Sequence, residues 1–185
     1  MCIETEATER FGAKKPLFIG DRLDTDILGA VRAGIDSALV LTGIDRPKHV
    51  LAAPEGSRPT YILSDLRELH QPYPEVTSKD GVHSVNGASV RVVGADVEII
   101  AEGESQIDLL RAGASAIWAS GTPVFVLRVP ERLYDDPSTG PDRRLAPPWL
   151  RRRVGAAAYS RGVSDETTNA PTDGLGSRLR LIEGQ

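Results

Sequence analysis

The chain has 185 residues, a formal net charge of −4 and a pI near 5.4, which argue against general binding to nucleic acids or anionic membrane surfaces. Hydrophobic residues make up 40% of it, enough for the core of one ordinary domain or two small ones. A single cysteine, Cys2, excludes an internal disulfide framework and fits a reducing compartment. No apolar run has membrane-spanning length and no basic-then-apolar leader is found, so we expect a cytoplasmic protein.

The clearest pattern lies in residues 16–43, PLFIGDRLDTDILGAVRAGIDSALVLTG. Leu17–Ile19 is a short apolar run that predicts a parallel strand, and Gly20 and Asp21 follow it directly. In open α/β sheets, ligands bind beyond the carboxyl ends of the strands. Asp21 is therefore placed to act on a ligand.

A helix and a second strand are expected after this turn. Thr25 is a suitable N-cap, Asp26 is an acid for the first helical turn, and Gly34 suits the position just after the helix. Ser37–Leu41 then predicts the next buried strand. The resulting βαβ unit brings the carboxyl ends of both strands to the same edge of a sheet.

Asp21 and Asp26 are separated by one tight turn, so both carboxylates can face the space above the strand ends. This suits Mg²⁺, which prefers oxygen ligands and is usually held by one or two carboxylates, waters and a substrate phosphate. The alternative is structural, with Asp21 as a turn residue and Asp26 as a charge that complements the helix dipole. Spacing alone leaves both interpretations open.

The longer pattern, GDRLDTDILGAVRAG followed by SALVLTG, resembles the fourth motif of haloacid dehalogenase-type (HAD) phosphatases of the NagD-like, class IIA type. The resemblance implies a Rossmann-like parallel sheet, a Mg²⁺ cofactor and phosphatase activity on a phosphorylated small-molecule substrate. By position, it implies that Asp21 is a magnesium ligand and that Asp26 supports the metal ligands through hydrogen bonds.

The chain departs from this family at its start. The family takes its nucleophile and general acid from an N-terminal DxD motif, and no such motif precedes Pro16. The family's phosphate-binding Lys lies well upstream, so its role transfers to neither Lys14 nor Lys15. Asp24 does not replace the nucleophile, because covalent phosphoryl transfer needs an activated carboxylate in line with the phosphorus. We therefore expect residues 1–74 to be the C-terminal part of a HAD hydrolase core, without catalytic residues and inactive alone.

The remainder of this first region predicts a helix over Arg46–Ala53, a strand over Pro59–Leu63, and a helix capped by Ser64 with Leu66 and Leu69 on its buried side. Prolines and the polar run VTSKDG then predict a boundary near residue 74. A half sheet leaves an apolar strand edge uncovered, so we expect either a complementing N-terminal HAD half or self-association.

Residues 81–134 predict a small ββαβ module. The run SVRVVGADVEIIA predicts a hairpin, a helix begins at Glu104 or Ser105, and Pro123–Val129 predicts a further strand. The helix carries an apolar stripe, interpreted as core, made of Ile107, Leu110, Ala114, Ile117 and Trp118. No catalytic or metal role is assigned to the histidines, which lack partners at metal-ligand spacing: His49, His70 and His83.

In order and position, this module resembles the acetyltransferase-like (GNAT-like) C-terminal region of actinobacterial HAD-type glycerol phosphate phosphatases. The resemblance points to a substrate of the glycerol or sugar phosphate class, and phosphoglycolate, nucleotides and pyridoxal phosphate stay open as alternatives. Arg152–Ala157, RRVGAA, fits an acyl-CoA pyrophosphate loop, yet it lies in residues 135–185, whose composition predicts a flexible or disordered tail. Arginines around Trp149 fit a solvated linker better than a phosphate or RNA site. The alternative function is a non-catalytic interaction module or a GNAT-like acyl-CoA-binding protein.

Overall fold

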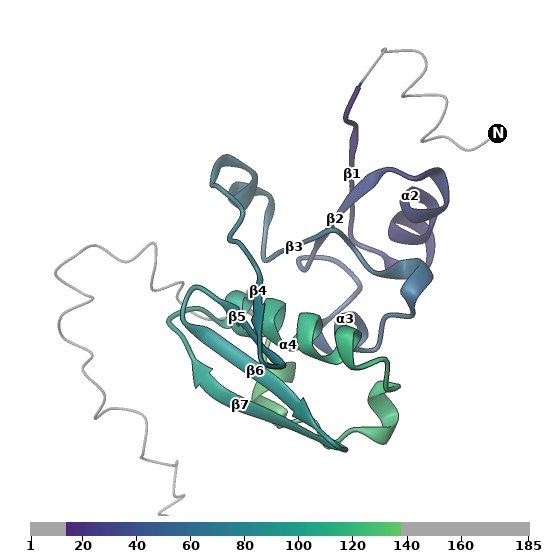
Figure 1. Cartoon of the computed structure of the whole chain (residues 1–185). Helices are drawn as coiled ribbons and strands as arrows, with labels where there is room; N and C mark the ends of the chain where they lie inside the picture. The colour runs from purple at the N-terminus through teal and green to yellow at the C-terminus, as the bar shows by residue number, and fades with distance from the viewer. Residues whose placement is uncertain (1–13, 138–185) are drawn as a thin grey trace, which may run out of the picture.

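The computed structural model describes residues 14–137, and its first part is a parallel sheet (Figure 1). The sheet consists of β1 (Leu17–Gly20), β2 (Asp36–Val40) and β3 (Tyr61–Leu63). Leu17 pairs with Asp36, and the strand order is β1-β2-β3, so β1 and β3 are the two edges among the described residues. The predicted α/β organisation with parallel strands is confirmed.

The connection from β1 to β2 is helical. A π-helical turn, η1 (Leu23–Ile27), continues directly as α2 (Leu28–Ala33). The predicted N-cap at Thr25 is wrong, because the helical conformation already begins at Leu23 and the cap position is Arg22. Gly34 follows α2 with a φ of 67°, the left-handed conformation expected for a glycine after a helix.

The connection from β2 to β3 contains α3 (Pro47–Leu51), which confirms the helix predicted there, and a short 3₁₀ turn, η2 (Glu55–Ser57). Val50 and Leu51 are buried, because α3 packs against the long helix of the second region. A proline at the first helical position suits α3, since its missing N–H has no intrahelical partner there.

The helix predicted after Ser64 is instead a 3₁₀ helix, η3 (Leu66–His70). Its cap is Asp65, whose carboxylate accepts a hydrogen bond from the Arg67 N–H at 2.7 Å. The predicted buried side is wrong: Leu66 is 56% exposed and Leu69 is 41% exposed. Residues three apart share one face of a 3₁₀ helix, and in η3 the face that carries both leucines is turned toward solvent.

The second sheet is antiparallel, with its strands in chain order: β4 (Thr77–Lys79), β5 (Val82–Val85), β6 (Ala88–Val93) and β7 (Asp96–Glu102). The predicted hairpin is confirmed as β6 and β7. The polar run predicted as a linker supplies β4 and its turn, where Asp80 has a φ of 52°. Aspartate tolerates this left-handed conformation better than most residues.

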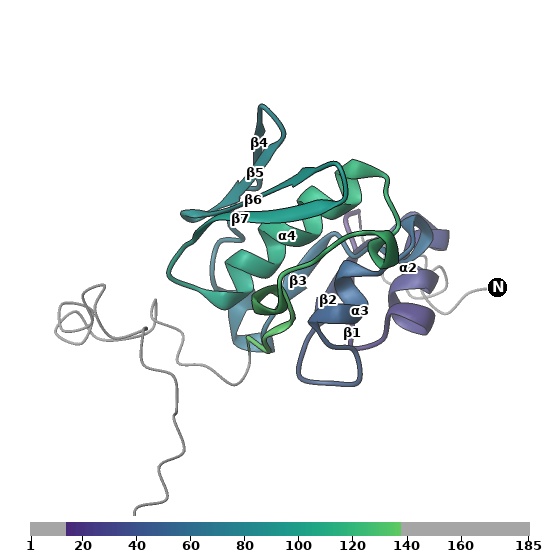
Figure 2. The same ribbon diagram turned by 90° about the horizontal axis from the view of Figure 1, so that it is seen from below.

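A 15-residue helix, α4 (Gln106–Ser120), packs on the second sheet and separates it from α3 and the first sheet (Figure 2). The strand predicted over Pro123–Val129 is wrong. Val124–Val126 forms the 3₁₀ turn η4, and an isolated bridge from Asp96 to Arg128 joins this segment to β7. A proline precedes η4 and another precedes the next 3₁₀ turn, η5 (Glu131–Tyr134). Residues 81–134 therefore have the order βββα, made of β5, β6, β7 and α4, rather than the predicted ββαβ.

One hydrophobic core joins the segments on both sides of residue 74. It includes Leu39 from β2, Leu41 directly after β2, Val90 from the second sheet, and Leu109 and Leu110 from α4. A smaller cluster lies on the opposite face of the first sheet and consists of Ala38, Val40 and Leu63. The boundary at residue 74 stays a prediction, but α4 packs against elements on both sides of it.

Candidate metal-binding turn

Asp21 directly follows β1 and lies at the carboxyl edge of the parallel sheet, next to the loop that follows β2. Its side chain rests against Gly43: an added Cβ at Gly43 would come within 1.9 Å of Asp21 Oδ2 and 2.3 Å of Asp21 Cβ. A glycine is therefore needed for this close approach. Among the described residues, no hydrogen bond reaches the Asp21 carboxylate.

Asp26 holds the turn from inside. Its Oδ2 accepts hydrogen bonds from the backbone N–H groups of Asp21 and Arg22, both at 3.1 Å, and the Thr25 hydroxyl donates to its Oδ1 at 3.3 Å. Gly20 makes room for this side chain, because an added Cβ there would lie 2.3 Å from Asp26 Cβ. Asp26 thus fixes the backbone of the two residues that precede η1.

Asp24 lies on the outer side of the turn, where it pairs with Arg22. The guanidinium donates from Nε at 2.9 Å and from Nη2 at 2.7 Å to the two carboxylate oxygens. Hydrogen bonding to Arg22 lowers the pKa of Asp24, and the same bond raises the pKa of Arg22. The pair is exposed, so it fixes the charge state of Asp24 more than it stabilises the fold.

Asp45, which the sequence analysis missed, ties the loop after β2 to this turn. Its Oδ2 accepts a hydrogen bond from the Leu23 N–H at 2.6 Å, and its own N–H donates to the Asp21 carbonyl at 3.4 Å. Its Oδ1 lies 3.1 Å from His49 Nδ1. The available signal was an acid two residues after Gly43, because a βαβ unit brings the residues that follow its two strands together.

Three of the four carboxylates at this turn accept hydrogen bonds from described residues: Asp24, Asp26 and Asp45. The Asp21 carboxylate is therefore the one available to bind a ligand. One such carboxylate suits Mg²⁺, which keeps several waters and takes further oxygen ligands from a substrate phosphate. Within residues 14–137, no group of three His, Cys, Asp or Glu side chains is arranged to hold a metal ion. Asp21 fits as one ligand of an ion whose other oxygens come from elsewhere.

The three histidines lie apart from one another. His49 belongs to α3, His70 ends η3, and His83 belongs to β5. The ring of His83 faces α4, where its Nδ1 lies 2.8 Å from Ser115 Oγ, and burial lowers its pKa. The structure therefore does not bring the histidines together into one site.

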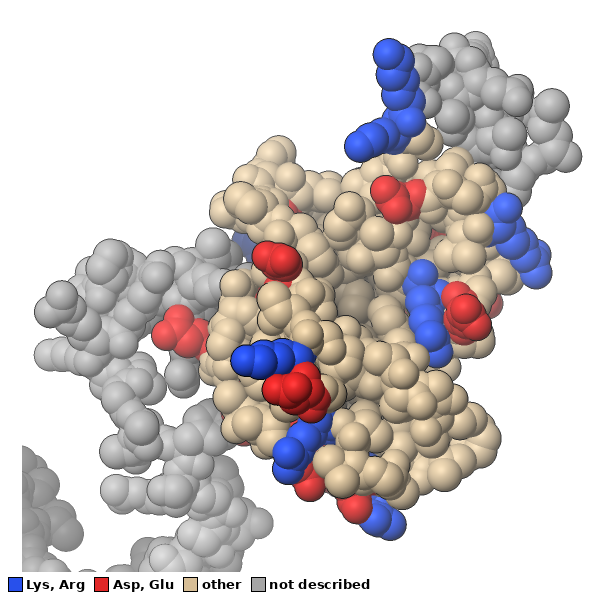
Figure 3. Space-filling view, viewed as in Figure 1, with Lys and Arg blue, Asp and Glu red and all other residues tan. Residues whose placement is uncertain are grey.

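Arg152–Ala157 and the arginines around Trp149 lie outside the described residues, as does Cys2. On the face shown in Figure 3, basic and acidic side chains are interspersed. None of the helices described in residues 14–137 has the length and apolar character needed to cross a membrane.

The first region of the chain matches a known protein family. Residues 4–69 match a protein family described as HAD-hydrolase-like, and this range contains β1 to β3 with the Asp21 turn. Over these residues the chain is similar to HAD-type hydrolases, in line with the resemblance of residues 20–43.

The comparisons also give particular relatives. The D-glycerol 3-phosphate phosphatase of Mycobacterium tuberculosis is 41% identical over 118 residues, which cover 62% of this chain and 33% of that protein. The crystal structure of the M. tuberculosis glycerol phosphate phosphatase with magnesium matches at 36% identity and a TM-score of 0.56, covering 68% of this chain and 36% of the other. Its complex with calcium matches at 38% identity and a TM-score of 0.53, covering 63% and 34%.

The chain thus spans about a third of the length of the relatives it matches. Because the 118 matched residues outnumber the range 4–69, the likeness extends beyond the first sheet. The chain is related to glycerol phosphate phosphatase over this part of its length. The GNAT-like resemblance finds no support in these comparisons and stays a prediction.

Proposed function

We propose that this chain carries the magnesium-ligand turn of a phosphomonoester phosphatase for small phosphorylated compounds of the glycerol or sugar phosphate class. The supporting observation is the Asp21 carboxylate, which lies at the carboxyl edge of the sheet while its backbone is bonded by Asp26 and Asp45. The likeness to a glycerol phosphate phosphatase whose structure holds magnesium points the same way.

Each residue of the turn then has a distinct part. Asp21 contributes one carboxylate oxygen to the ion, Asp26 fixes the Asp21 backbone, and Gly43 leaves space for the Asp21 side chain. Bound Mg²⁺ supplies positive charge that stabilises the phosphoryl group during its transfer. Holding the ligand by its backbone keeps its position fixed, which is what a preorganised metal ligand needs.

We further propose that the chain alone does not hydrolyse phosphate esters. Covalent phosphoryl transfer needs a carboxylate nucleophile in line with the phosphorus. Asp24 is bound to Arg22 and Asp26 to the backbone, so neither is placed for that task. Polypeptide corresponding to the remaining two-thirds of the relatives would supply the nucleophile, in this chain's longer form or from a complementing partner.

A magnesium titration followed by amide NMR tests the metal role. We expect Mg²⁺ to shift the amide signals of residues 20–27 and 43–45, and Asp21→Asn to weaken that response at least about tenfold, because it removes the ligand charge. Asp24→Asn is the matched control, since it changes charge in the same turn without touching Asp21, and should keep the response. Equal loss in both variants, or no response in the unmodified chain, would contradict the role of Asp21.

The missing nucleophile is tested separately with a generic aryl phosphate and Mg²⁺. Turnover should stay at background for the unmodified chain. Robust turnover that Asp21→Asn abolishes would confirm the metal role but show that the chain holds its own nucleophile.

A further inference from the structure

The turn between β5 and β6 consists of Asn86 and Gly87, which are both exposed. Their φ angles are 44° and 85°, and Val85 pairs with Ala88 across the turn. Positive φ at both central residues is the geometry of a two-residue type I′ hairpin turn, for which Asn-Gly and Asp-Gly are both suitable. The turn alone therefore does not decide between an amide and an acid at position 86.

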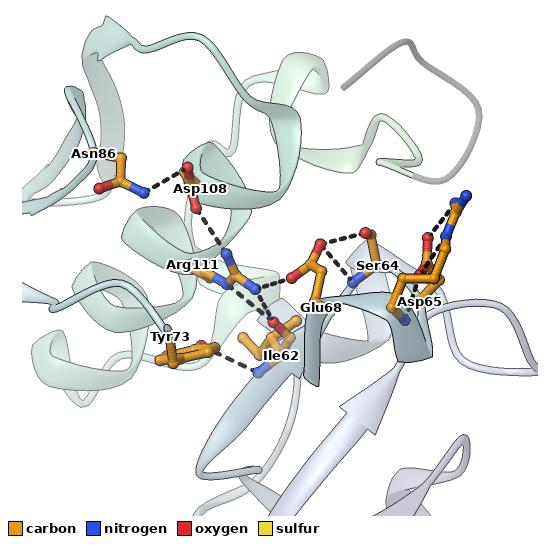
Figure 4. A network of polar contacts seen from close by, with 9 residues as sticks. Ile62, Ser64, Asp65, Glu68, Tyr73, Asn86, Asp108 and Arg111 are labelled. Carbon is orange, nitrogen blue, oxygen red and sulfur yellow. Dashed lines mark hydrogen bonds and ion pairs between the residues drawn. The ribbon is translucent and has the colours of Figure 1, made fainter. Parts of the chain in front are cut away.

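The side-chain amide of Asn86 has a specific partner on α4. Its Nδ2 donates to Asp108 Oδ2 at 3.1 Å (Figure 4). Asp108 is 1% exposed, and its Oδ1 accepts from Arg111 Nη1 at 2.7 Å. An aspartate at position 86 would be ionised at neutral pH and would have no proton to donate. This contact therefore favours the amide.

Arg111 connects the contact to the first sheet. Its guanidinium donates to the Ile62 carbonyl from Nε at 2.9 Å and from Nη2 at 2.6 Å. The Tyr73 hydroxyl accepts a hydrogen bond from the Ile62 N–H at 3.1 Å (Figure 4). These two side chains occupy the positions that a neighbouring strand would take beside β3. Asn86 is thus connected to the backbone of β3 through Asp108 and Arg111.

An asparagine that precedes a glycine is chemically labile, because glycine has no side chain to hinder its backbone nitrogen. The Gly87 nitrogen can attack Asn86 Cγ and close a five-membered succinimide ring. The bond from Cγ to the side-chain nitrogen breaks, and that nitrogen leaves as ammonia with the proton from the Gly87 N–H. Water then opens the ring at either carbonyl, which gives aspartate or isoaspartate. The reaction consumes water and needs no oxidant or reductant.

We propose that Asn86 is a site of spontaneous deamidation, and that its conversion weakens the network that joins the second sheet to β3. The product replaces a hydrogen-bond donor with an acceptor and places a negative charge beside the Asp108 carboxylate. Two carboxylates in contact repel each other, most strongly where water is excluded. Isoaspartate also lengthens the backbone of a two-residue turn that sets the register of β5 with β6.

Peptide mapping by mass spectrometry of the chain after storage in mildly alkaline buffer is the first test. We expect aspartate and isoaspartate at position 86, and we expect the converted protein, separated by ion exchange, to melt at a lower temperature. The same chain unfolded in urea gives the reference rate, because its amide is free of Asp108. Asn86 that stays intact in the folded chain, even after about ten times the storage that converts the unfolded chain, would overturn the proposal.

Variants separate the charge from the lost hydrogen bond. Asn86→Asp should lower the Tm by roughly 3–8 °C, and Asn86→Ala, which removes the donor without adding a charge, should lower it less. Asp80→Asn is the matched control, since Asp80 and Gly81 form the exposed turn between β4 and β5 with φ angles of 52° and 75°. It should leave the Tm unchanged. An unchanged Tm in Asn86→Asp, or an equal loss in the control, would contradict the proposed consequence.

Hydrogen exchange then tests the connection to β3. Asn86→Asp should speed exchange of the Ile62 amide at least about fivefold, because the added charge disturbs the Asp108–Arg111 pair that supports it. Asp80→Asn should leave this rate unchanged, and circular dichroism confirms that each variant is folded. If Asn86→Asp affected only the amides of its own turn, the proposed effect on β3 would be wrong.

Discussion

β3 and β1 border the same parallel sheet, yet within residues 14–137 side chains complete the β3 edge and none completes the β1 edge. The groups that complete the β3 edge, Arg111 and Tyr73, lie beyond the strand in sequence, with Arg111 forty-nine residues after Ile62. The β1 edge carries Asp21, the candidate metal ligand. Arg111 of the second region, together with Tyr73, therefore closes the first sheet at the side away from the candidate site.

The side chains that complete the β3 edge also belong to a network of buried charges around Arg111. Arg111 is 2% exposed, donates to Asp108 Oδ1 at 2.7 Å, and its guanidinium lies 4.6 Å from the centre of the Tyr73 ring. Glu68 accepts from Arg111 and from the Ser64 hydroxyl, as Figure 4 shows. A buried cation needs this many partners, because removal from water is costly unless the charge is paired.

Substitution of Arg111 should have the largest effect. Arg111→Met removes the charge that compensates buried Asp108 and the donors to the Ile62 carbonyl, so we expect a loss of about 3–5 kcal/mol in the free energy of unfolding, measured with urea. The matched control is Arg91→Met, which breaks the exposed pair with Glu98 and should cost less than about 1 kcal/mol. Similar losses in both variants would mean that the β3 edge is not held by this buried network.

The Gly43→Ala substitution should disturb the Asp21 turn that follows β1. The new Cβ meets Asp21 at 1.9–2.3 Å, so the Asp21 side chain must move, and we expect about 1–3 kcal/mol of destabilisation together with loss of the Mg²⁺-dependent amide shifts. Gly56→Ala is the control, because its Cβ would find Leu28 only at 4.0 Å. If Gly43→Ala kept both stability and the Mg²⁺ response, the position of Asp21 described above would be incorrect.

Asp45→Ala should have a smaller effect. It removes the acceptor for the Leu23 N–H, and losing a helix-terminal acceptor typically costs about 1 kcal/mol. Thermal unfolding gives the stability change, and faster hydrogen exchange at Leu23 shows whether the turn loosens. Asp45→Asn keeps a carbonyl acceptor and should restore most of the protection. An unchanged exchange rate in Asp45→Ala would argue against Asp45 as the support of this turn.

The smallest effect is expected at Tyr73, and it depends on pH. Burial raises the pKa of Tyr73, although the Arg111 charge opposes the rise, so the folded state keeps the phenolic proton to higher pH than the unfolded state. The stabilisation is therefore complete below the ordinary tyrosine pKa of about 10 and is lost as the pH rises above it.

Tyr73→Phe removes both the acceptor and the titration. At neutral pH it should cost about 0.5–1.5 kcal/mol, the usual worth of one hydrogen bond. Above pH ~10, its stability should fall less steeply with pH than that of the unmodified chain. Urea midpoints across this pH range measure the difference, and parallel curves for the two proteins would contradict it.

Local sequence predicted the first region well where a single pattern decides the structure. Leu17–Ile19 and Ser37–Leu41 are apolar runs bounded by turn residues, and they form β1 and β2. The predictions were wrong where contacts with residues distant in sequence decide the structure. Pro123–Val129 has the composition of a strand, but no described strand offers it a ladder beyond the bridge at Arg128, and its prolines favour 3₁₀ turns.

The sequence by itself determined the parallel βαβ unit and the place of Asp21 at its carboxyl edge, because alternation, helix periodicity and glycine position act over a few residues. Only the tertiary structure decided that Asp45 would bond the Asp21 turn and that Arg111 would cap the β3 edge. Both contacts join residues far apart in the chain, and their partners are backbone groups, which every residue carries. Such contacts leave no pattern in a single sequence until packing brings the segments together.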